Sequence, residues 1–275
     1  MTDLPQDLAA PLTRTGSRLG RFASRVSYFA ELTSTNDVAA ELASRGAPEG
    51  TTIVADSQTA GRGRRGRAWF SPPGAGLYTS VVLRPRGHTE RLPLAVTSAL
   101  TLAAGVALTA AIRETTGLHV TLKWPNDVVV EERAPARRRK LAGILTEGST
   151  AGHDLQYAIV GFGINVKSAS LPPDLRPLAT SIEAELGRPV ERGVVLAASL
   201  AALDAQYTAL LDGRIDAILS RWRELAPASC GARVRWQSAA GTLEGVTNGI
   251  DDSGALLVRV GSASERVISG ELEWL

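Results

Sequence analysis

The residue types best suited to chemistry are concentrated between Asp56 and Trp69, where three glycines alternate with four arginines. Glycine lets the backbone adopt positive φ and approach a ligand closely. Each guanidinium offers a forked set of donors to phosphate or carboxylate oxygens. The apolar segment 51–55 precedes them and predicts a buried strand, so the loop would extend from a rigid element. These residues predict an anion-binding loop, although arginine–glycine runs also occur in disordered RNA-binding tails, and the segment alone does not decide between the two.

The composition of the whole chain is that of a globular protein. Of its 275 residues, 44% are hydrophobic and 21% are charged, which gives ample material for a core. The four arginines and two aspartates within residues 1–25 account for the entire formal net charge of +2. Because the remaining residues are formally neutral, the chain lacks a global electrostatic footprint for nucleic acid.

Cysteine usage and hydropathy bear on the compartment. The single cysteine, Cys230, excludes an intramolecular disulfide framework and favours a reducing compartment; we expect it to be a small core residue. The N-terminus has acids and prolines but no apolar stretch typical of a signal peptide. Residues 92–112 are uncharged, yet rich in alanine and threonine, so their hydrophobicity is weak for a membrane span. We therefore expect a buried helix there, and a cytoplasmic protein.

Hydrophobic periodicity predicts the elements that would position the loop. A long helix is expected at 94–113. Residues 125–127 would form a turn between two strands, and the basic segment 131–139 would be the polar tip of a β-hairpin with a long loop. Gly161 and Gly163 interrupt an apolar strand, which indicates a close backbone approach. The expected strands are 51–55, 77–83, 119–124, 128–130, 140–145 and 155–166.

The flanking segments have weaker patterns. Residues 1–25 show no sustained periodicity and are expected to form a mobile tail. Residues 33–37 precede a helical segment, so a hydroxyl or amide side chain is expected to cap that helix, and the same donors could also meet a ligand. Residues 167–180 contain three prolines and predict a loop that orders on ligand binding. Two helices with apolar core stripes are expected at 194–210 and 215–225, followed by a small β module over 228–275.

Five motifs occur in an order that resembles the biotin protein ligases (biotin–[acetyl-CoA-carboxylase] ligases) across about residues 26–275. The motifs are Ser34-Thr35-Asn36, the block from Gln58 to Trp69, Lys123-Trp124-Pro125-Asn126-Asp127, Lys140-Leu141-Ala142-Gly143-Ile144-Leu145 and Gly161-Phe162-Gly163-Ile164-Asn165. The resemblance implies an α+β fold. A mixed β-sheet catalytic domain with flanking helices, of the class II synthetase-like biotin/lipoate ligase type, would span 26–227. An SH3-like β-barrel would follow at 228–275.

The resemblance also implies a two-step reaction with ATP and biotin as substrates and Mg²⁺ as cofactor. The biotin carboxylate attacks the α-phosphate of ATP to give biotinyl-5′-adenylate and pyrophosphate, and a carrier lysine then attacks this mixed anhydride. Such chemistry needs no serine, cysteine or histidine nucleophile, because the adenylate itself activates the carboxyl carbon. It needs fixed positive charge where phosphate and carboxylate meet.

The resemblance assigns roles to individual residues. Arg62, Arg64 and Arg67 match loop arginines that close over biotin and phosphate, whereas Arg65 is expected to be solvated. Lys140 matches a lysine that contacts both the biotin carboxylate and the α-phosphate, a contact that suits a compact ammonium. The predicted biotin-binding set is Ser34, Thr35, Asn36, Gln58, Gly61, Arg62, Gly63, Arg64, Trp69, Lys140 and Gly143.

A second set is implied for the nucleotide and the chemical steps. The predicted nucleotide-binding residues are Arg67, Trp69, Lys123, Asn126, Lys140 and Asn165, and the predicted catalytic residues are Lys140, Arg64, Arg67 and Asp127. Asp127 has three open roles: it could bind Mg²⁺, receive the proton of the acceptor lysine, or stabilise a turn.

The implied partner is the biotin carboxyl carrier domain of a biotin-dependent carboxylase. About 25 residues precede the matching region, too few for a folded helix-turn-helix reader, so no sequence-specific DNA binding is expected. The weak hydrophobicity of residues 92–112 predicts no membrane association. We expect a monomer or a weak homodimer. A lipoate–protein ligase is the alternative enzyme, disfavoured by the arginine–glycine block and the C-terminal β module. An RNA-binding module is the alternative outside enzymes, disfavoured because the loop interrupts a strand-rich core.

Overall fold

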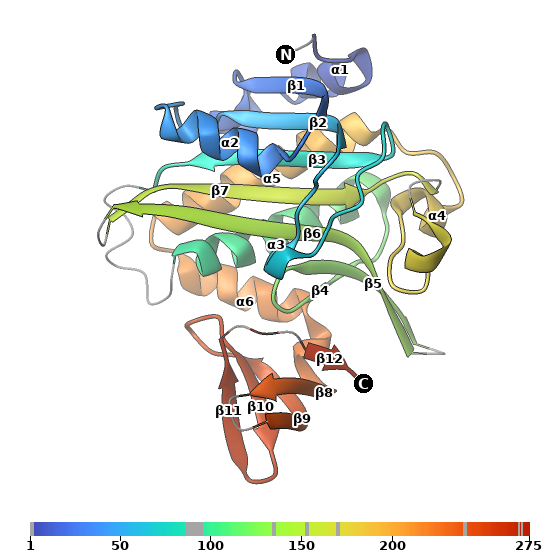
Figure 1. Ribbon diagram of the computed structural model, residues 1–275, viewed down its shortest axis with the longest axis vertical. Coiled ribbons are helices and arrows are strands. Elements are labelled where there is room, and N and C mark those ends of the chain that lie inside the picture. Colours follow the sequence, from blue (N-terminus) through green and yellow to red (C-terminus); the bar gives the residue numbers. More distant parts are fainter. Residues whose placement is uncertain are drawn as a thin grey trace.

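A seven-stranded mixed β-sheet forms the centre of the molecule (Figure 1). The computed structural model describes residues 3–85, 96–133, 136–151, 154–168, 171–238, 241–268, 270 and 272–275. The strands are β1 (Val26–Leu32), β2 (Thr52–Gln58), β3 (Gly76–Leu83), β4 (Thr121–Lys123), β5 (Asp127–Arg133), β6 (Ala136–Ala151) and β7 (Asp154–Asn165). Their order is β1-β2-β3-β7-β6-β5-β4; β1 and β2 are parallel, and the other neighbouring pairs are antiparallel.

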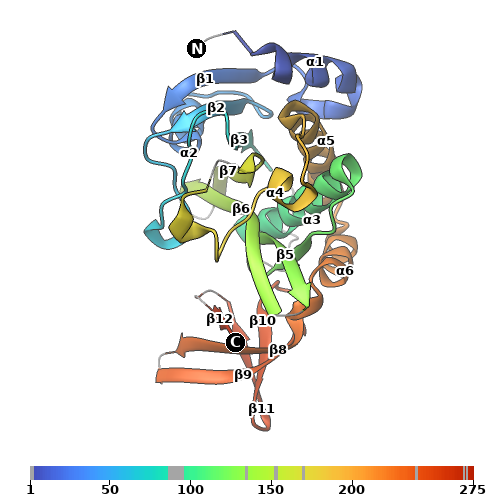
Figure 2. The same ribbon diagram turned by 90° about the vertical axis from the view of Figure 1, so that its right-hand side faces the viewer.

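Helices cover both faces of this sheet, as the turned view in Figure 2 shows. On one face, α2 (Thr35–Ser44) packs over a small apolar cluster that includes Ile53, Val82 and Ile159. On the other face lie α3 (Val96–Thr116) and α5 (Arg192–Leu211), against which α6 (Ile215–Leu225) packs. The expected buried helix is confirmed for Val96–Thr116, whereas residues 92–95 lie outside the described residues.

Two helices in the described part of the chain, α3 and α5, are long and apolar enough to cross a membrane. Their most apolar windows are 67% and 50% buried inside the protein. The two helices pack against each other and against the sheet. Burial in this core accounts for their apolar composition, because a helix that is hydrophobic all round fits the centre of a large domain.

Residues 6–22 are helical, which contradicts the mobile tail predicted for residues 1–25. Both α1 (Gln6–Thr15) and the 3-10 helix η1 (Gly16–Phe22) pack on α5. Leu8 and Phe22 are fully buried there. Arg192 joins the helix to the sheet, since its guanidinium lies 2.7 Å from Asp7 and 2.7 Å from Asp56. Asp7 and Arg192 are 185 positions apart, and local periodicity cannot reveal such a contact.

The basic segment 131–139 is not the long hairpin loop that was predicted. Strands β5 and β6 continue to the pair Arg133↔Ala136, and residues 134–135 between them lie outside the described residues. Acids neutralise two of the arginines of this segment: Arg138 pairs with Glu131, and Arg139 pairs with Glu132 and Glu185.

Two local predictions are also wrong. Cys230 is exposed at the start of β8 (Cys230–Ser238) rather than buried, because this strand begins at the protein surface. Ser34 occupies the N-cap of α2, but its side chain makes no capping hydrogen bond in the described structure. Thr35 and Asn36 instead turn into a buried polar network beneath the helix.

The C-terminal module is a five-stranded antiparallel sheet in the order β11-β10-β9-β8-β12. Beyond β8 its strands are β9 (Gly241–Ile250), β10 (Leu256–Val260), β11 (Ala263–Val267) and β12 (Leu272–Trp274). Trp124 donates its indole N–H to the carbonyl of Gly254 at 3.0 Å, and Arg223 donates to the carbonyl of Ile250 at 3.0 Å. These bonds fix the small sheet beside the β4–β5 end of the large one (Figure 1).

Candidate functional site

Gly143, Gly161 and Gly163, on two neighbouring strands, leave a flat surface on the sheet face that α2 also covers. We call this surface the glycine floor. Gly143 of β6 stands in register with Gly163 of β7, and Leu145 stands in register with Gly161. A Cβ on Gly161 would lie 1.9 Å from Asn36 Oδ1, and one on Gly163 would lie 2.4 Å from the Trp69 indole. Real side chains cannot approach so closely, so these positions require glycine and leave room above the sheet.

Trp69 lies across this floor. Its indole passes over both Gly143 and Gly163, within reach of any added Cβ. The indole N–H is buried and finds no hydrogen-bond acceptor among the described residues. A buried, unpaired donor costs about 1–3 kcal/mol. A ligand acceptor beside the indole N–H, or a rotation of the ring, would remove this cost.

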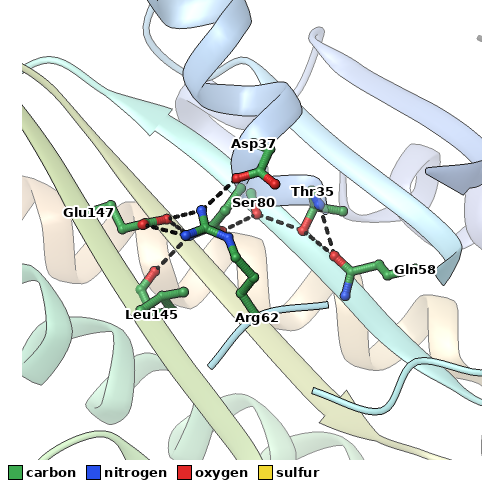
Figure 3. Close-up of polar contacts among 8 residues, drawn as sticks. Thr35, Asp37, Gln58, Arg62, Ser80, Leu145 and Glu147 are labelled. Carbon is green, nitrogen blue, oxygen red and sulfur yellow. Dashed lines mark hydrogen bonds and ion pairs between the residues drawn. The ribbon is translucent and has the colours of Figure 1, made fainter. Parts of the chain in front are cut away.

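A cavity lies above these glycines, and a connected polar network that includes its lining residues Thr35, Asn36 and Gln58 forms one wall (Figure 3). Gln58 Oε1 accepts hydrogen bonds from the backbone N–H and the hydroxyl of Thr35 at 2.8 and 3.1 Å. Ser80 Oγ donates to Asn36 Oδ1 at 2.6 Å and lies 2.8 Å from Thr35 Oγ1. Asn36 Nδ2 in turn donates to Glu147 at 2.6 Å. The wall is therefore pre-organised, with buried hydroxyl and amide groups held in fixed orientations.

The glycine–arginine loop is an ordered hairpin rather than a free tail. Trp69 N donates to Gly61 O at 2.8 Å, and Gly63 N donates to Arg67 O at 2.7 Å. Arg65, at the tip, adopts φ 57°, a left-handed conformation that is uncommon for a residue with a side chain. The loop crosses the front of the sheet in Figure 1. The hairpin places Arg62 and Arg64 in the lining of the cavity that also contains Gly143, Gly161 and Gly163.

Lys140 stands where two cavities meet, because it lines both of them. Its Nζ lies 2.6 Å from Asp127 Oδ1, in the geometry of an ion pair rather than an aligned hydrogen bond. The same ammonium lies 5.1 Å from the centre of the Trp69 ring. Arg64 also lines both cavities, and burial, followed by the neighbouring Arg65, lowers its pKa from the ordinary value. Two cations thus converge on the junction.

The second, larger cavity lies between the main sheet and the small C-terminal sheet. Lys123 lines it, and burial lowers the pKa of this ammonium, with the cations of Lys140, Arg138 and Arg67 lowering it further and Asp127 opposing them. Part of its apolar lining comes from the C-terminal sheet and from the loop before α4 (Ile182–Leu186): Leu171, Leu175, Leu178, Leu272 and Trp274. A charged end and an apolar wall suit a ligand with phosphates and a ring system.

The structure brings the predicted residues together in two groups. The first cavity is lined by all of the predicted biotin set except Gly61: Ser34, Thr35, Asn36, Gln58, Arg62, Gly63, Arg64, Trp69, Lys140 and Gly143. The second is lined by the whole predicted nucleotide set and by Asp127: Arg67, Trp69, Lys123, Asn126, Lys140, Asn165 and Asp127.

Asn165 and Arg62 also make contacts that stabilise the fold, and Gly61 has a structural role in the hairpin. Asn165 donates to the carbonyl of Thr180 at 3.0 Å and so secures the loop before α4. A Cβ on Gly61 would lie 2.5 Å from the Trp69 carbonyl, so this glycine lets the two arms of the hairpin pair closely. Arg62 is held by Asp37 and Glu147 (Figure 3).

Sequence reasoning missed the residues that support the predicted set. Ser80 and Glu147 were not singled out, and Trp274 was read only as part of a small β module. Glu147 lies on the same face of β6 as Gly143, so the two-residue alternation of that strand could have placed Glu147 near the site. No local sequence pattern could have identified Trp274, because its contact with Lys123 depends on how the two sheets pack.

The described residues contain no group of three or more histidine, cysteine, aspartate or glutamate side chains placed to hold a metal. Asp127 is the carboxylate in the larger cavity, and Lys140 already pairs with it. This donor set fits magnesium only in the mode in which substrate phosphates and water supply most ligands, a mode common for this ion.

Comparisons with known proteins agree with this geometry. The sequence model of the Biotin/lipoate A/B protein ligase family matches residues 28–165, and that of the Biotin protein ligase C terminal domain matches residues 229–273. A Paracoccus denitrificans protein named biotin–[acetyl-CoA-carboxylase] ligase is 36% identical over 242 residues, covering 86% of this chain and 94% of the relative. The bifunctional ligase/repressor BirA of Bacillus subtilis (strain 168) is 34% identical over 271 residues, covering 98% and 80%.

A solved structure shows the same architecture. The biotin protein ligase from Aquifex aeolicus in complex with biotin and ATP superposes with a TM-score of 0.76 at 27% identity. The match covers 92% of this chain and 99% of that one. The predicted α+β fold, with a mixed sheet and flanking helices followed by a C-terminal β module, is confirmed. The module is a five-stranded antiparallel sheet, and its closure into an SH3-like barrel stays a prediction.

Proposed function

The chain belongs to the Biotin/lipoate A/B protein ligase family, and from that premise we propose that it is an ATP-dependent biotin–[biotin carboxyl-carrier protein] ligase. It activates biotin as biotinyl-5′-AMP and transfers the biotinyl group to one lysine of a carrier domain. The observation that carries the proposal is the position of Lys140 and Arg64 at the junction of the two cavities. A carboxylate from the glycine-floored cavity and a phosphate from the larger one would meet at these two cations.

The residues present perform distinct tasks in the first step. The polar wall of Thr35, Gln58 and Asn36 binds and orients the ureido ring of biotin with fixed donors and acceptors. Lys140 and Arg64 offset the charge of the biotin carboxylate and the α-phosphate, which otherwise repel each other on approach. Lys123 meets nucleotide phosphate. Preorganised charge in a partly dry site is worth more than the same charge in water.

In the second step, an uncharged acceptor lysine attacks the carboxyl carbon of the adenylate, the bond to AMP breaks, and the amine loses a proton. Asp127 lies 2.6 Å from Lys140, one of the two cations at the junction. We propose that Asp127 either accepts this proton or binds the magnesium ion. Mutation of Asp127 distinguishes the two roles. Of the residues in the larger cavity, Asp127 could hold a magnesium ion together with the nucleotide phosphates, and the ion would neutralise phosphate charge.

Biotin is favoured over lipoate because the C-terminal module matches the Biotin protein ligase C terminal domain. The partner is the carrier domain of a biotin-dependent carboxylase, as the name of the Paracoccus relative suggests. We further propose a cytoplasmic enzyme, monomeric or weakly dimeric, without sequence-specific DNA binding. A mobility-shift titration with genomic fragments tests the last point, and site-specific retention would overturn it.

A direct assay tests the activity itself. The protein is incubated with Mg-ATP, a carrier domain and either labelled biotin or labelled lipoate, and the label on the carrier is measured. We expect transfer of biotin only, with a carrier whose acceptor lysine is replaced by arginine as the control. Transfer of lipoate in place of biotin would show that the alternative activity is the correct one.

A further inference from the structure

The guanidinium of Arg62 is held between two carboxylates from different elements (Figure 3). Glu147 of β6 accepts two parallel hydrogen bonds from it, at 3.0 and 2.8 Å. Asp37 of α2 lies 2.6 Å from the same group. The forked geometry is the strongest arrangement available to an arginine and a carboxylate. The Arg62 side chain is 41% exposed, so the contact stands at the rim of the cavity.

The charge of this cluster argues against a direct role of Arg62 in binding an anion. One guanidinium faces two carboxylates, which leaves a formal charge of −1 at the rim. A third carboxylate, such as that of biotin, would be repelled there or would have to displace a bound acid. Lys140 and Arg64 lie deeper and line both cavities, so they are the groups placed to receive the ligand anions.

The same cluster fixes the glycine–arginine hairpin onto the sheet. Arg62 lies in one arm of the hairpin and forms a β-bridge with Ala68 in the other, next to Trp69. Glu147 also accepts a hydrogen bond from Asn36 Nδ2 at 2.6 Å. Glu147 is therefore the point at which the covering loop and the polar wall of the cavity are tied together.

We propose that Glu147 and Asp37 are positioning residues that latch residues 61–69 over the cavity through Arg62, and that Arg62 is an anchor rather than a ligand. The latch slows the escape of the adenylate between the two steps, a consequence that rests on the proposed function. The closed state of the loop does not depend on that function, so it is tested separately.

A double-mutant cycle over Glu147→Gln, Arg62→Ala and their combination tests the latch. Glu147→Gln keeps the shape of the side chain and an acceptor for Asn36 but removes the charge. We expect each single variant to release biotinyl-adenylate about three- to tenfold faster in a chase experiment, and the double variant to be no worse than either single, the signature of one shared interaction. Asp37→Asn is expected to give a smaller change in the same direction.

A second readout needs no ligand. Limited trypsin digestion of the protein alone, followed by mass spectrometry, reports cleavage after Arg65, which is at the tip of the hairpin. We expect this cleavage to accelerate in the same variants by a similar factor. Arg45→Ala is the matched control, because Arg45 forms an exposed 2.7 Å ion pair with Glu41 on the same helix as Asp37. This control should leave both rates unchanged.

The outcomes separate the two proposals. If no adenylate forms in the wild-type protein, the proposed function fails, while the trypsin readout still decides the latch. If Glu147→Gln matches wild type in loop cleavage, the latch is wrong. If Arg62→Ala weakens equilibrium binding of biotin and Glu147→Gln does not, Arg62 is a ligand and the inference is overturned.

Discussion

The ammonium of Lys140 lies 2.6 Å from the carboxylate of Asp127, and the two residues come from neighbouring antiparallel strands. Lys140 lines both cavities, whereas Asp127 lines the larger one. Under the proposed function, an ammonium already offset by one carboxylate would also meet two ligand anions. Asp127 therefore orients Lys140 in the free protein, and the arrival of a phosphate would have to redistribute this contact.

Replacing Lys140 should affect the first chemical step most. We expect Lys140→Ala to lower kcat/KM for adenylate formation by about 100-fold or more, as for the loss of one preorganised donor at a reacting centre. Pyrophosphate exchange measures this step without the carrier. Lys167→Ala, which changes an exposed lysine, is the control. An equal loss of kcat/KM in that variant would mean that the net positive charge of the protein, and not the position of Lys140, determines the rate.

Replacing Asp127 distinguishes its open roles. If Asp127 takes the proton of the acceptor lysine, Asp127→Asn should preserve pyrophosphate exchange and slow the transfer to the carrier. If it shares the magnesium ion, exchange should fall and recover in part at higher magnesium concentration. Unchanged rates in both steps would leave only the turn role.

Nucleotide binding should weaken at a lower pH than the pKa of an ordinary lysine would predict. Burial, followed by neighbouring cations, lowers the pKa of Lys123, so in the free protein this group loses its proton below the usual lysine range. The protonated form binds phosphate, and affinity for ATP should therefore fall as pH rises through that pKa. Calorimetric titrations from about pH 7 to about pH 10 would follow the change. Lys123→Arg keeps its charge throughout, and this variant should lack the alkaline decline.

Trp274 links the C-terminal sheet to the same lysine. Its ring centre lies 5.8 Å from Lys123 Nζ and 5.0 Å from Arg138 Cζ, and its indole N–H is buried without an acceptor among the described residues. We expect Trp274→Ala to raise the KM for ATP about 5- to 30-fold while the KM for biotin stays the same, since such contacts are worth about 1–2 kcal/mol. Glu273→Gln, on the same strand and exposed, is the control. A parallel rise in the KM for biotin would indicate a general loss of structure.

Much of the site could be predicted because its residues are contiguous motifs. The arginine–glycine block, the turn at 125–127 and the glycines at 161 and 163 each combine a local conformation with a reactive or permissive residue type. The strands that carry them were located because apolar runs bounded by glycine and proline are strong local signals. Their boundaries moved by a few residues; β6, for example, extends from Ala136 to Ala151.

What could not be predicted depends on contacts between distant segments. Arg192 meets Asp7 and Asp56, and Glu147 meets Arg62, through side chains that carry no pattern of their own. A charged residue on a strand is ordinarily solvated, and the choice of partner is made by tertiary packing. The N-terminal helices were missed for the same reason.

The glycine floor should not tolerate a methyl group. A Cβ on Gly163 would lie 2.4 Å from the Trp69 indole, so Gly163→Ala must displace the ring from its place across the two strands. We expect a changed tryptophan emission spectrum and a biotin affinity at least about tenfold weaker, within the range for steric misfit at a packed site. Thr150→Ala, on an exposed part of the neighbouring strand, should change neither quantity. If the emission of Gly163→Ala matches that of wild type, the indole does not rest on the floor.

The N-terminal helix should contribute to global stability rather than behave as a dispensable tail. Leu8 is 1% exposed and packs in the main core with α5 residues, so Leu8→Ala should lower the free energy of unfolding by about 2–5 kcal/mol. Urea unfolding followed by far-UV circular dichroism measures this. Thr13→Ala, on an exposed position of the same helix, should cost about 0.5 kcal/mol or less. Equal, small effects of the two variants would mean that the helix detaches readily and that the main sheet is stable without it.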